Sequence, residues 1–287
     1  MGRLRSSVSE QTASPVAEAS PLATGILDEY IRSPPSGEAA INIFRGEWSS
    51  KLPPPYDSCT GTSSLFDDAR ITWAETLLNG FEGLRILELG PLEAGHTTML
   101  ERAGAASIKA IEANSRSFLK CLIVKELLGL QRSSFLHGDF MEYLPNTPDR
   151  YDLCVASGVL YHMRDPVEAL RLIGGVSDTI LLWTHYFDEE AVMKRPELVA
   201  KFSSRASKNM GEFGYDEYRY EYGDALNWQG FCGGSSSYSN WLSRDAIIWV
   251  LQNLGFDSIE IEFDDLNHQN GPAFAVLARR SVSSGTV

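Results

Sequence analysis

The chain has 287 residues, of which 43% are hydrophobic, and it carries a formal net charge of −13 at pH 7. No uninterrupted apolar run approaches the roughly 20 residues that cross a bilayer, so we expect no membrane partner. The acidic excess disfavours a nucleic-acid partner, because phosphate binding depends on clustered Lys and Arg. The length suffices for one large domain with a substantial core and some additional structure.

The chain has four cysteines that lie far apart and form no metal-ligand pair: Cys59, Cys121, Cys154 and Cys232. We therefore expect no bound metal and a reduced, cytoplasmic protein. Gly2 and Ser6 fit the loose myristoylation pattern, which we interpret as a chance match.

The first part of the chain divides into a tail and an extension. Residues 1–38 are rich in Ser, Ala, Pro and Glu without sustained periodicity, which predicts a disordered tail. Residues 39–83 form an N-terminal extension that ends in a predicted helix over 67–78. We expect this helix to cover a ligand site or, equally, to serve as a plain packing helix.

From residue 84 onward, strand and helix patterns alternate. Such a rhythm predicts a doubly wound α/β fold with ligand sites at the carboxyl ends of the strands. We predict one domain over residues 84–287, with a mostly parallel, Rossmann-like seven-stranded sheet that ends in an antiparallel pair. The expected strands span residues 85–89, 107–111, 134–137, 151–156, 179–183, 258–263 and 273–278. The expected helices of this domain span 97–102, 115–128, 166–174 and 244–253.

Residues 186–240 interrupt the alternation after the fifth strand. They contain two predicted helices, over 189–194 and 197–208, and then a run rich in Gly and Tyr. Because the insertion leaves the sheet on its ligand side, its rings favour a substrate pocket with a lid; the alternative is a small satellite core. The candidate acceptor-binding residues are Tyr186, Tyr218, Tyr220, Trp228 and Trp241.

The first strand leads into a glycine-punctuated turn, from Gly90 to Gly95, and then into a helix. A unit of this kind brings backbone N–H groups close to a nucleotide-like ligand. The carboxylate of Glu88 would repel a pyrophosphate, but it suits the amine and sulfonium of S-adenosylmethionine. We therefore predict S-adenosylmethionine as the cofactor, bound in part by Glu88, Gly90 and Gly95.

Polar residues also end the next strands. Glu112 lies 24 residues after Glu88, the spacing expected of a carboxylate that accepts from ribose hydroxyls; otherwise it is a solvated acid before a helix cap. Asp139 is expected to accept from the adenine amino group while Phe140 lines the base, or else to stabilise its own turn. Ser157 follows the fourth strand and is expected to contact the donor.

Three further residues lie where a methyl group would react. Tyr161 is expected to shape the channel. His162 is a candidate proton acceptor or a structural histidine, and His185, after the fifth strand, is an equally placed base.

These motifs together resemble the class I S-adenosylmethionine-dependent methyltransferases. The resemblance covers about residues 67–280 and rests on 86–90, 111–114, 138–140 and 157–162. The run from Gly158 to His162, followed by Asp165-Pro166, is most similar to the tRNA 5-carboxymethoxyuridine methyltransferases.

The chain departs from that group in two ways. The usual Gly-x-Gly-x-Gly loop is replaced by the 90–95 segment, and residues 66–70 lack the basic Trp-Lys-Trp-type motif. We therefore expect methyl transfer from S-adenosylmethionine to an oxygen or nitrogen of a small-molecule acceptor. The alternatives are a tRNA wobble-uridine methyltransferase and a non-catalytic binding protein with the same fold.

Overall fold

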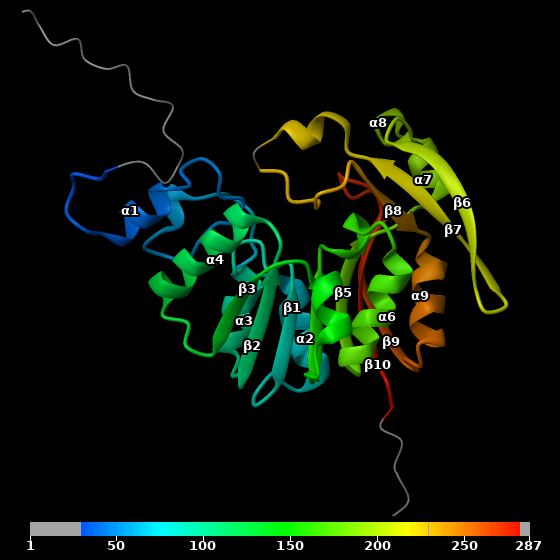
Figure 1. The fold of residues 1–287 in the computed structure, drawn as a ribbon, viewed down its shortest axis with the longest axis horizontal. Coiled ribbons are helices and arrows are strands. Elements are labelled where there is room, and N and C mark those ends of the chain that lie inside the picture. The colour runs from blue at the N-terminus through cyan, green and yellow to red at the C-terminus, as the bar shows by residue number, and fades with distance from the viewer. Residues whose placement is uncertain (1–29, 229, 282–287) are drawn as a thin grey trace, which may run out of the picture. The chain divides into compact units, whose positions relative to one another are not determined.

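The computed structural model describes residues 30–228 and 230–281 (Figure 1). By internal contacts the chain divides into two units, residues 1–35 and 36–287, and every helix and strand described here belongs to the second. Up to residue 29 the predicted tail lies outside the described residues. The last two residues of the predicted tail, Gly37 and Glu38, begin helix α1 (Gly37–Asn42). The hydroxyl of Ser36 caps this helix by accepting from the N–H of Ala39 at 3.1 Å.

A seven-stranded sheet forms the centre of the second unit, in the order β3-β2-β1-β4-β5-β10-β9. Strands β1 to β5 run parallel, whereas β10 is antiparallel to both β5 and β9. The predicted fold class is therefore confirmed, including the terminal antiparallel pair. The strands are β1 (Arg85–Leu89), β2 (Ser107–Glu112), β3 (Ser133–His137), β4 (Leu153–Ser157), β5 (Thr179–His185), β9 (Ser258–Asp265) and β10 (Ala273–Arg279).

Helices cover both faces of this sheet (Figure 1). Successive side chains of a strand point to opposite faces, so Ile86 packs with α2 and α3 while Leu87 packs with α6 and α9. The continuous apolar runs of the parallel strands follow from this burial on two sides. The helices are α2 (Ala69–Leu78), α3 (Gly95–Arg102), α4 (Ser115–Leu128), α5 (Phe140–Tyr143), α6 (Pro166–Val176), α7 (Glu189–Met193), α8 (Pro196–Val199) and α9 (Arg244–Asn253), with single 3-10 turns η1 (Asp57–Cys59), η2 (Leu144–Asn146), η3 (Leu160–His162) and η4 (Gly223–Asn227).

The insertion forms a second, antiparallel sheet of β6 (Phe202–Met210), β7 (Phe213–Glu221) and β8 (Tyr238–Leu242). The predicted helix over residues 197–208 is therefore wrong. A two-residue turn, in which Gly211 has a φ of 62°, pairs Met210 with Phe213 and starts the β6–β7 hairpin. This long-range pairing overrides the weak local preference of the Ser-rich segment, which becomes a strand only because β7 lies beside it.

The beginning and end of the insertion lie side by side. The N–H of Phe187 donates to the carbonyl of Leu242 at 2.8 Å, and Phe187 forms a parallel bridge with Ser243. The chain therefore returns to the main sheet where it left it. No helix in the described part of the chain is both long and apolar enough to span a bilayer.

Candidate active site

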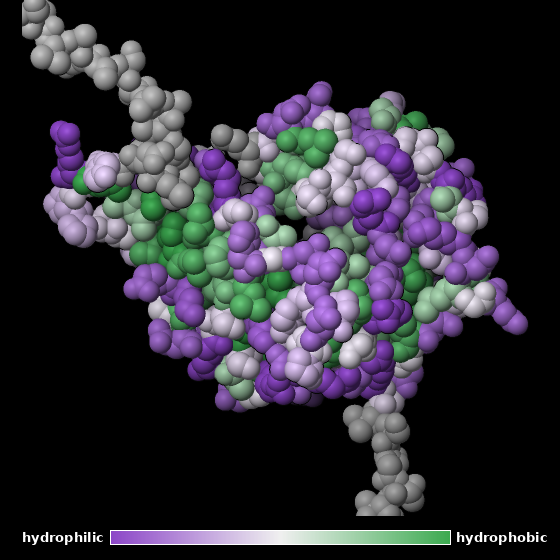
Figure 2. All heavy atoms as spheres, viewed as in Figure 1, coloured by the Kyte–Doolittle hydropathy of each residue, from purple (hydrophilic) through white to green (hydrophobic). Residues whose placement is uncertain are grey.

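A cavity of about 940 Å³ lies at the carboxyl ends of the parallel strands. Residues at or just after the ends of β1 to β5 line this cavity. The 232–236 segment of the insertion forms another part of its wall. Figure 2 shows the surface hollowed between η4 and these strand ends. Of the sequence-predicted site residues, seven line this cavity: Gly90, Glu112, Asp139, Phe140, Ser157, Tyr161 and His162.

The loop after β1 is shaped by close backbone approach. Gly90 has a φ of 64°, and a Cβ there would lie 2.6 Å from Cγ1 of Val159. Leu92 and Ala94 also have positive φ values, of 54° and 60°. A glycine is therefore required at position 90, where the loop passes the segment after β4.

Gly95 does not line the cavity, contrary to its predicted contact with the cofactor. A Cβ at this position would lie 2.6 Å from the carbonyl oxygen of Leu65 and 2.7 Å from its Cβ. Gly95 therefore allows the extension to pack against the first turn of α3, and Leu65 itself lines the cavity. Its role is to bring the extension to the site.

Glu88 is also absent from the cavity wall, because its side chain points into the interior. It is 2% exposed, and its carboxylate accepts a hydrogen bond from the hydroxyl of Thr97 in α3. Burial raises the pKa of Glu88 above its usual value. Glu88 joins the end of β1 to the helix that follows the loop, so any effect of its carboxylate on a ligand acts through that loop.

Glu112 stands at the cavity with its carboxylate already fixed. Oε2 accepts from the N–H of Leu92 at 3.1 Å, and Oε1 accepts from the N–H of Asn114 at 2.8 Å. Burial raises its pKa, and these hydrogen bonds act in the opposite direction. Each oxygen retains a lone pair for a ligand hydroxyl, so Glu112 can accept from a ribose while it orders the loop.

Asp139 and Phe140 lie on the same side of the cavity, at the start of α5. Asp139 caps that helix, its Oδ1 accepting from the N–H of Met141 at 2.8 Å. Its second oxygen remains available at the cavity wall. Phe140 is 7% exposed and also lines the cavity. The turn-stabilising role foreseen for Asp139 is thus present, together with a position suited to the base of a nucleotide.

His162 lies on the opposite side of the cavity, in η3. Its Nδ1 is 2.8 Å from the hydroxyl of Tyr222, which comes from the insertion. Burial lowers the pKa of His162 to about 3, so the ring is neutral at physiological pH. With Nδ1 engaged by Tyr222, Nε2 is the nitrogen left to exchange a proton with a ligand. Tyr161 packs against this ring, with centroids 4.1 Å apart.

His185 does not reach the cavity. Its Nδ1 donates to the carbonyl of Gly271 at 2.9 Å, and its ring stacks on Trp241 at 5.2 Å. Burial lowers the pKa of His185 to about 4. The prediction that the two histidines are equally placed is therefore wrong, because the carbonyls of the β9–β10 connection hold His185 in the core.

None of the five aromatic residues expected to bind the acceptor lines the cavity. Tyr186 is buried against Phe274 and donates its hydroxyl to Asp264 at 2.8 Å. Tyr218 stacks on Phe187, and Tyr220 stacks on Trp241. These rings form the satellite core that was the alternative to a substrate pocket. Trp228 is 64% exposed. The insertion instead offers small residues to the cavity: Cys232, Gly233, Gly234, Ser235 and Ser236.

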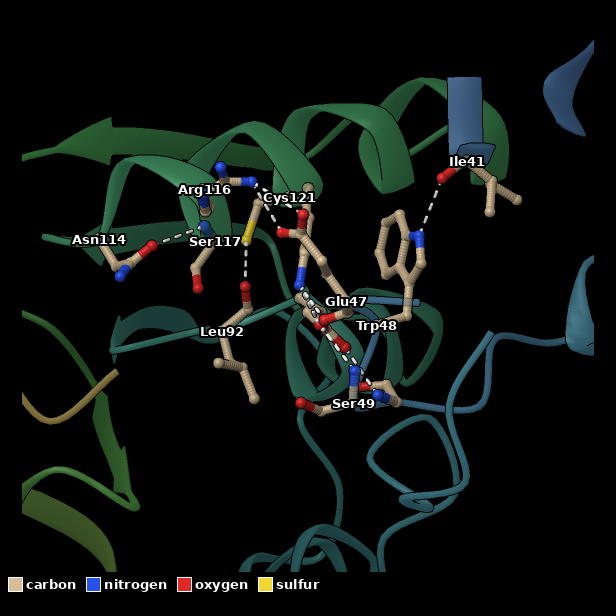
Figure 3. Close-up of polar contacts among 12 residues, drawn as sticks. Ile41, Glu47, Trp48, Ser49, Leu92, Asn114, Arg116, Ser117 and Cys121 are labelled. Atoms are coloured by element: carbon tan, nitrogen blue, oxygen red, sulfur yellow. Dashed lines mark hydrogen bonds and ion pairs between the residues drawn. The ribbon is translucent and has the colours of Figure 1, made fainter. Parts of the chain in front are cut away.

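The extension is fastened to the loop by the buried carboxylate of Glu93. Its oxygens accept from the N–H groups of Ser49 at 3.0 Å and Ser50 at 2.7 Å, and from Nζ of Lys120 at 2.8 Å. Trp48 donates its Nε1 to the carbonyl of Ile41 at 3.0 Å (Figure 3). The charge of Glu93 is fully hydrogen-bonded, and the loop, α4 and the extension form one rigid cluster.

The sequence did not predict a second group of residues at the cavity, which begins with Asp68 and Arg70 of the extension. Asp68 binds Arg70 through a bidentate ion pair, and its Oδ2 lies 2.8 Å from Nε2 of His96. The guanidinium of Arg70 lies over the ring of Trp183, 4.5 Å from its centroid. Arg70, His96 and Trp183 all line the cavity. The only sequence signal was a charged N-cap before α2, which is common in ordinary helices.

Within the described residues, no group of three or more His, Cys, Asp or Glu side chains is arranged to hold a metal ion.

No protein-family model matches the chain, and no curated protein matches it in sequence. Among solved structures, the N-terminal domain of EvdMO1, crystallised in the presence of SAH and D-fucose, is similar over 86% of this chain and 95% of that one. Its identity is 23% and the TM-score is 0.62. In the larger EvdMO1 crystal structure the match covers 77% of this chain and 41% of that one.

Two further structures share the architecture. An S-adenosylmethionine-dependent methyltransferase from Mesorhizobium loti matches 76% of this chain and 100% of its own, at 16% identity and a TM-score of 0.51. Magnesium protoporphyrin IX methyltransferase from Synechocystis PCC 6803, with bound SAH, matches 75% and 81%, at 14% identity and a TM-score of 0.50. These proteins and the chain share the arrangement of the sheet and its helices. The chain therefore has the Rossmann-like fold of class I methyltransferases.

Proposed function

We propose that this protein transfers a methyl group from S-adenosylmethionine to a hydroxyl oxygen of a small molecule. The observation that carries the proposal is one continuous cavity with two chemically different halves. Gly90, Glu112 and Phe140 line one half, and Tyr161 and His162 line the other. A volume of about 940 Å³ lies at the upper end of the usual range for ligand sites, which suits a cofactor together with a second ligand.

The residues of the first half fit this cofactor. Gly90 brings the loop backbone to the cavity wall, and Glu112 offers two carboxylate oxygens of fixed orientation to a ribose. Asp139 and Phe140 offer an acceptor and an apolar edge to an adenine. Structural neighbours crystallised with SAH support the same assignment.

In the second half, His162 is the group suited to receive a proton. When bound, S-adenosylmethionine supplies an electrophilic methyl group on a sulfonium. A hydroxyl oxygen becomes strongly acidic as it bonds to carbon, so even a weakly basic, neutral imidazole can hold the proton at Nε2. Tyr222 fixes the ring through Nδ1, and the cavity walls hold the reacting groups in line. These features favour oxygen over nitrogen as the methylated atom.

The first test is calorimetry with SAH, followed by a product screen with methyl-labelled S-adenosylmethionine and hydroxylated small molecules. We expect micromolar-range binding of SAH and labelled product that disappears in His162→Gln without loss of SAH binding. His268→Gln is the matched control, because His268 lies outside the cavity wall. Failure to bind SAH would reject the cofactor. Binding without turnover for any acceptor would indicate a non-catalytic methyltransferase-fold protein.

A further inference from the structure

Arg70 is held in one orientation by contacts on two sides. Its Nε donates to Oδ1 of Asp68 at 2.9 Å, its Nη2 donates to Oδ2, and its plane lies over Trp183. Burial alone would raise the pKa of Asp68, but hydrogen bonds from Arg70 and His96 hold that pKa well below its usual range. Asp68 is therefore ionised at any physiological pH, and the pair is permanent.

One edge of the Arg70 guanidinium has no partner among residues 30–228 and 230–281. Within the described residues, nothing accepts from Nη1, although the Arg70 side chain is only 17% exposed and lines the cavity. A guanidinium that is immobilised on two sides and open on the third is arranged to donate to a ligand. Surface arginines, by contrast, move freely in water.

The position of Arg70 places this open edge on the acceptor side. Trp183, over which Arg70 lies, belongs to β5 and pairs with Ser157 of β4. The donor residues Gly90 and Glu112 follow β1 and β2, on the other side of β4 in the sheet. Arg70 therefore reaches from Asp68, which contacts His96 after the donor loop, to Trp183 of β5, whose ring packs against Tyr161.

The charge of the acceptor half decides which kind of ligand suits this edge. Asp68 already neutralises Arg70, and the other charges that line this half, Arg164 and Asp165, are also opposite in sign. An anionic ligand would place a second negative charge beside Asp68 in a poorly solvated site. A hydroxyl oxygen would accept from Nη1 without adding charge.

We propose that Arg70 binds the methyl acceptor and selects a neutral, polyhydroxylated molecule of the saccharide type over an anionic one. The inference rests on the proposed function, since it names the acceptor class of the same cavity. The hydroxyls of Ser235 and Ser236 line the cavity as well and add uncharged partners for such a ligand. Trp183 and Tyr161 supply the apolar wall that a sugar ring requires.

The test compares two sugars of the same ring stereochemistry, D-fucose and D-galacturonate, which differ at C6 by a methyl group and a carboxylate. Their binding to SAH-saturated protein is measured by saturation-transfer NMR titration. We expect D-fucose to bind at least about tenfold more tightly than D-galacturonate. Arg70→Gln should weaken D-fucose by about tenfold or more, the range for a lost hydrogen bond to a charged group, and leave the SAH affinity unchanged.

Two further variants keep the result interpretable. Arg70→Lys retains the positive charge but not the planar guanidinium, so its affinity for D-fucose should fall nearly as far as that of Arg70→Gln. Arg150→Gln removes a surface partner of Asp178 outside the cavity and should change neither the D-fucose affinity nor the SAH affinity. A preference for D-galacturonate, or no binding of either sugar, would overturn the proposed acceptor class. A loss of SAH affinity in Arg70→Gln would assign Arg70 to the donor. If wild-type protein does not bind SAH, the proposed function itself fails.

Discussion

Nζ of Lys120 lies 2.8 Å from Oε1 of Glu93, and the exposed fractions of the two side chains are 7% and 0%. Removal of one partner from such a buried pair leaves the other charge without compensation. Lys120→Met should therefore lower the free energy of unfolding by about 3 kcal/mol and weaken SAH binding, because the extension loses its hold on the loop.

Chemical denaturation and calorimetry of the same variant measure both effects. Lys194→Met is the control, since Lys194 pairs with Glu190 on the exposed surface and its loss should leave both quantities essentially unchanged. Retention of full stability in Lys120→Met would mean that the other contacts of the extension, including the bonds from Ser49 and Ser50 to Glu93, hold it without the ion pair.

Gly90→Ala should weaken SAH binding more than it weakens the fold. An alanine with positive φ costs about 1–2 kcal/mol, and the added methyl also meets Val159 at 2.6 Å. Gly83→Ala separates the two contributions, because Gly83 has a φ of 76° and an added methyl group would meet no other atom within 4 Å. Equal SAH affinity in the two alanine variants would show that the close approach at position 90 is unimportant for the donor.

Glu112→Gln should weaken SAH binding by about 1–3 kcal/mol, because a charged acceptor of ribose hydroxyls becomes neutral and one loop N–H loses its acceptor. Isothermal calorimetry at pH 7.5 gives this difference directly. Glu142→Gln, on the exposed side of α5, is the matched control and should bind SAH as wild type does. Wild-type affinity in Glu112→Gln would remove Glu112 from the donor site.

The buried histidines predict that stability falls in mild acid. His185 titrates near 6.5 when unfolded and near 4 when folded, so the unfolded state binds more protons between these values. The free energy of unfolding should therefore fall as pH decreases from about 6.5 to about 4, with a slope of up to about 1.4 kcal/mol per pH unit from this residue.

Urea titrations at pH 7.5, 5.5 and 4.5 test this dependence. His185→Gln should lower stability at pH 7.5, since the bond to Gly271 is disturbed, but it should reduce the slope below pH 6.5. An unchanged slope would mean that other groups control the acid transition. His162, with its still lower pKa, contributes in the same direction.

The sequence predicts the main sheet well because its signals are local. Strands β1, β4 and β5 contain short apolar runs between turn residues, and Glu112 is identifiable because it ends the next strand after β1 at a familiar spacing. Strand β6 has no such signal. Its residues are polar and largely exposed, and only pairing with β7 makes them a strand.

The same distinction separates the site residues that the sequence predicts from those it misses. Arg70 acquires its orientation from Trp183, which is more than one hundred positions away in the chain. Tyr186 fails as a candidate because its ring turns towards Phe274, and composition cannot reveal that direction. Contacts between elements that are far apart in the chain decide both cases, and one sequence alone does not reveal such contacts.

The hydrogen bond between Phe187 and Leu242 has a consequence for how such a protein changes over evolutionary time. It closes the insertion at its base, so the chain between these residues can lengthen, shorten or be exchanged while the β5–β10 pairing stays intact. The 232–236 segment, which lines the cavity, and Tyr222, which contacts His162, lie within that exchangeable loop. Glu112 and Arg70 lie outside it. Replacement of one contiguous stretch of gene would therefore exchange the part of the cavity wall that the insertion supplies, while Arg70, His162 and Trp183 keep their places.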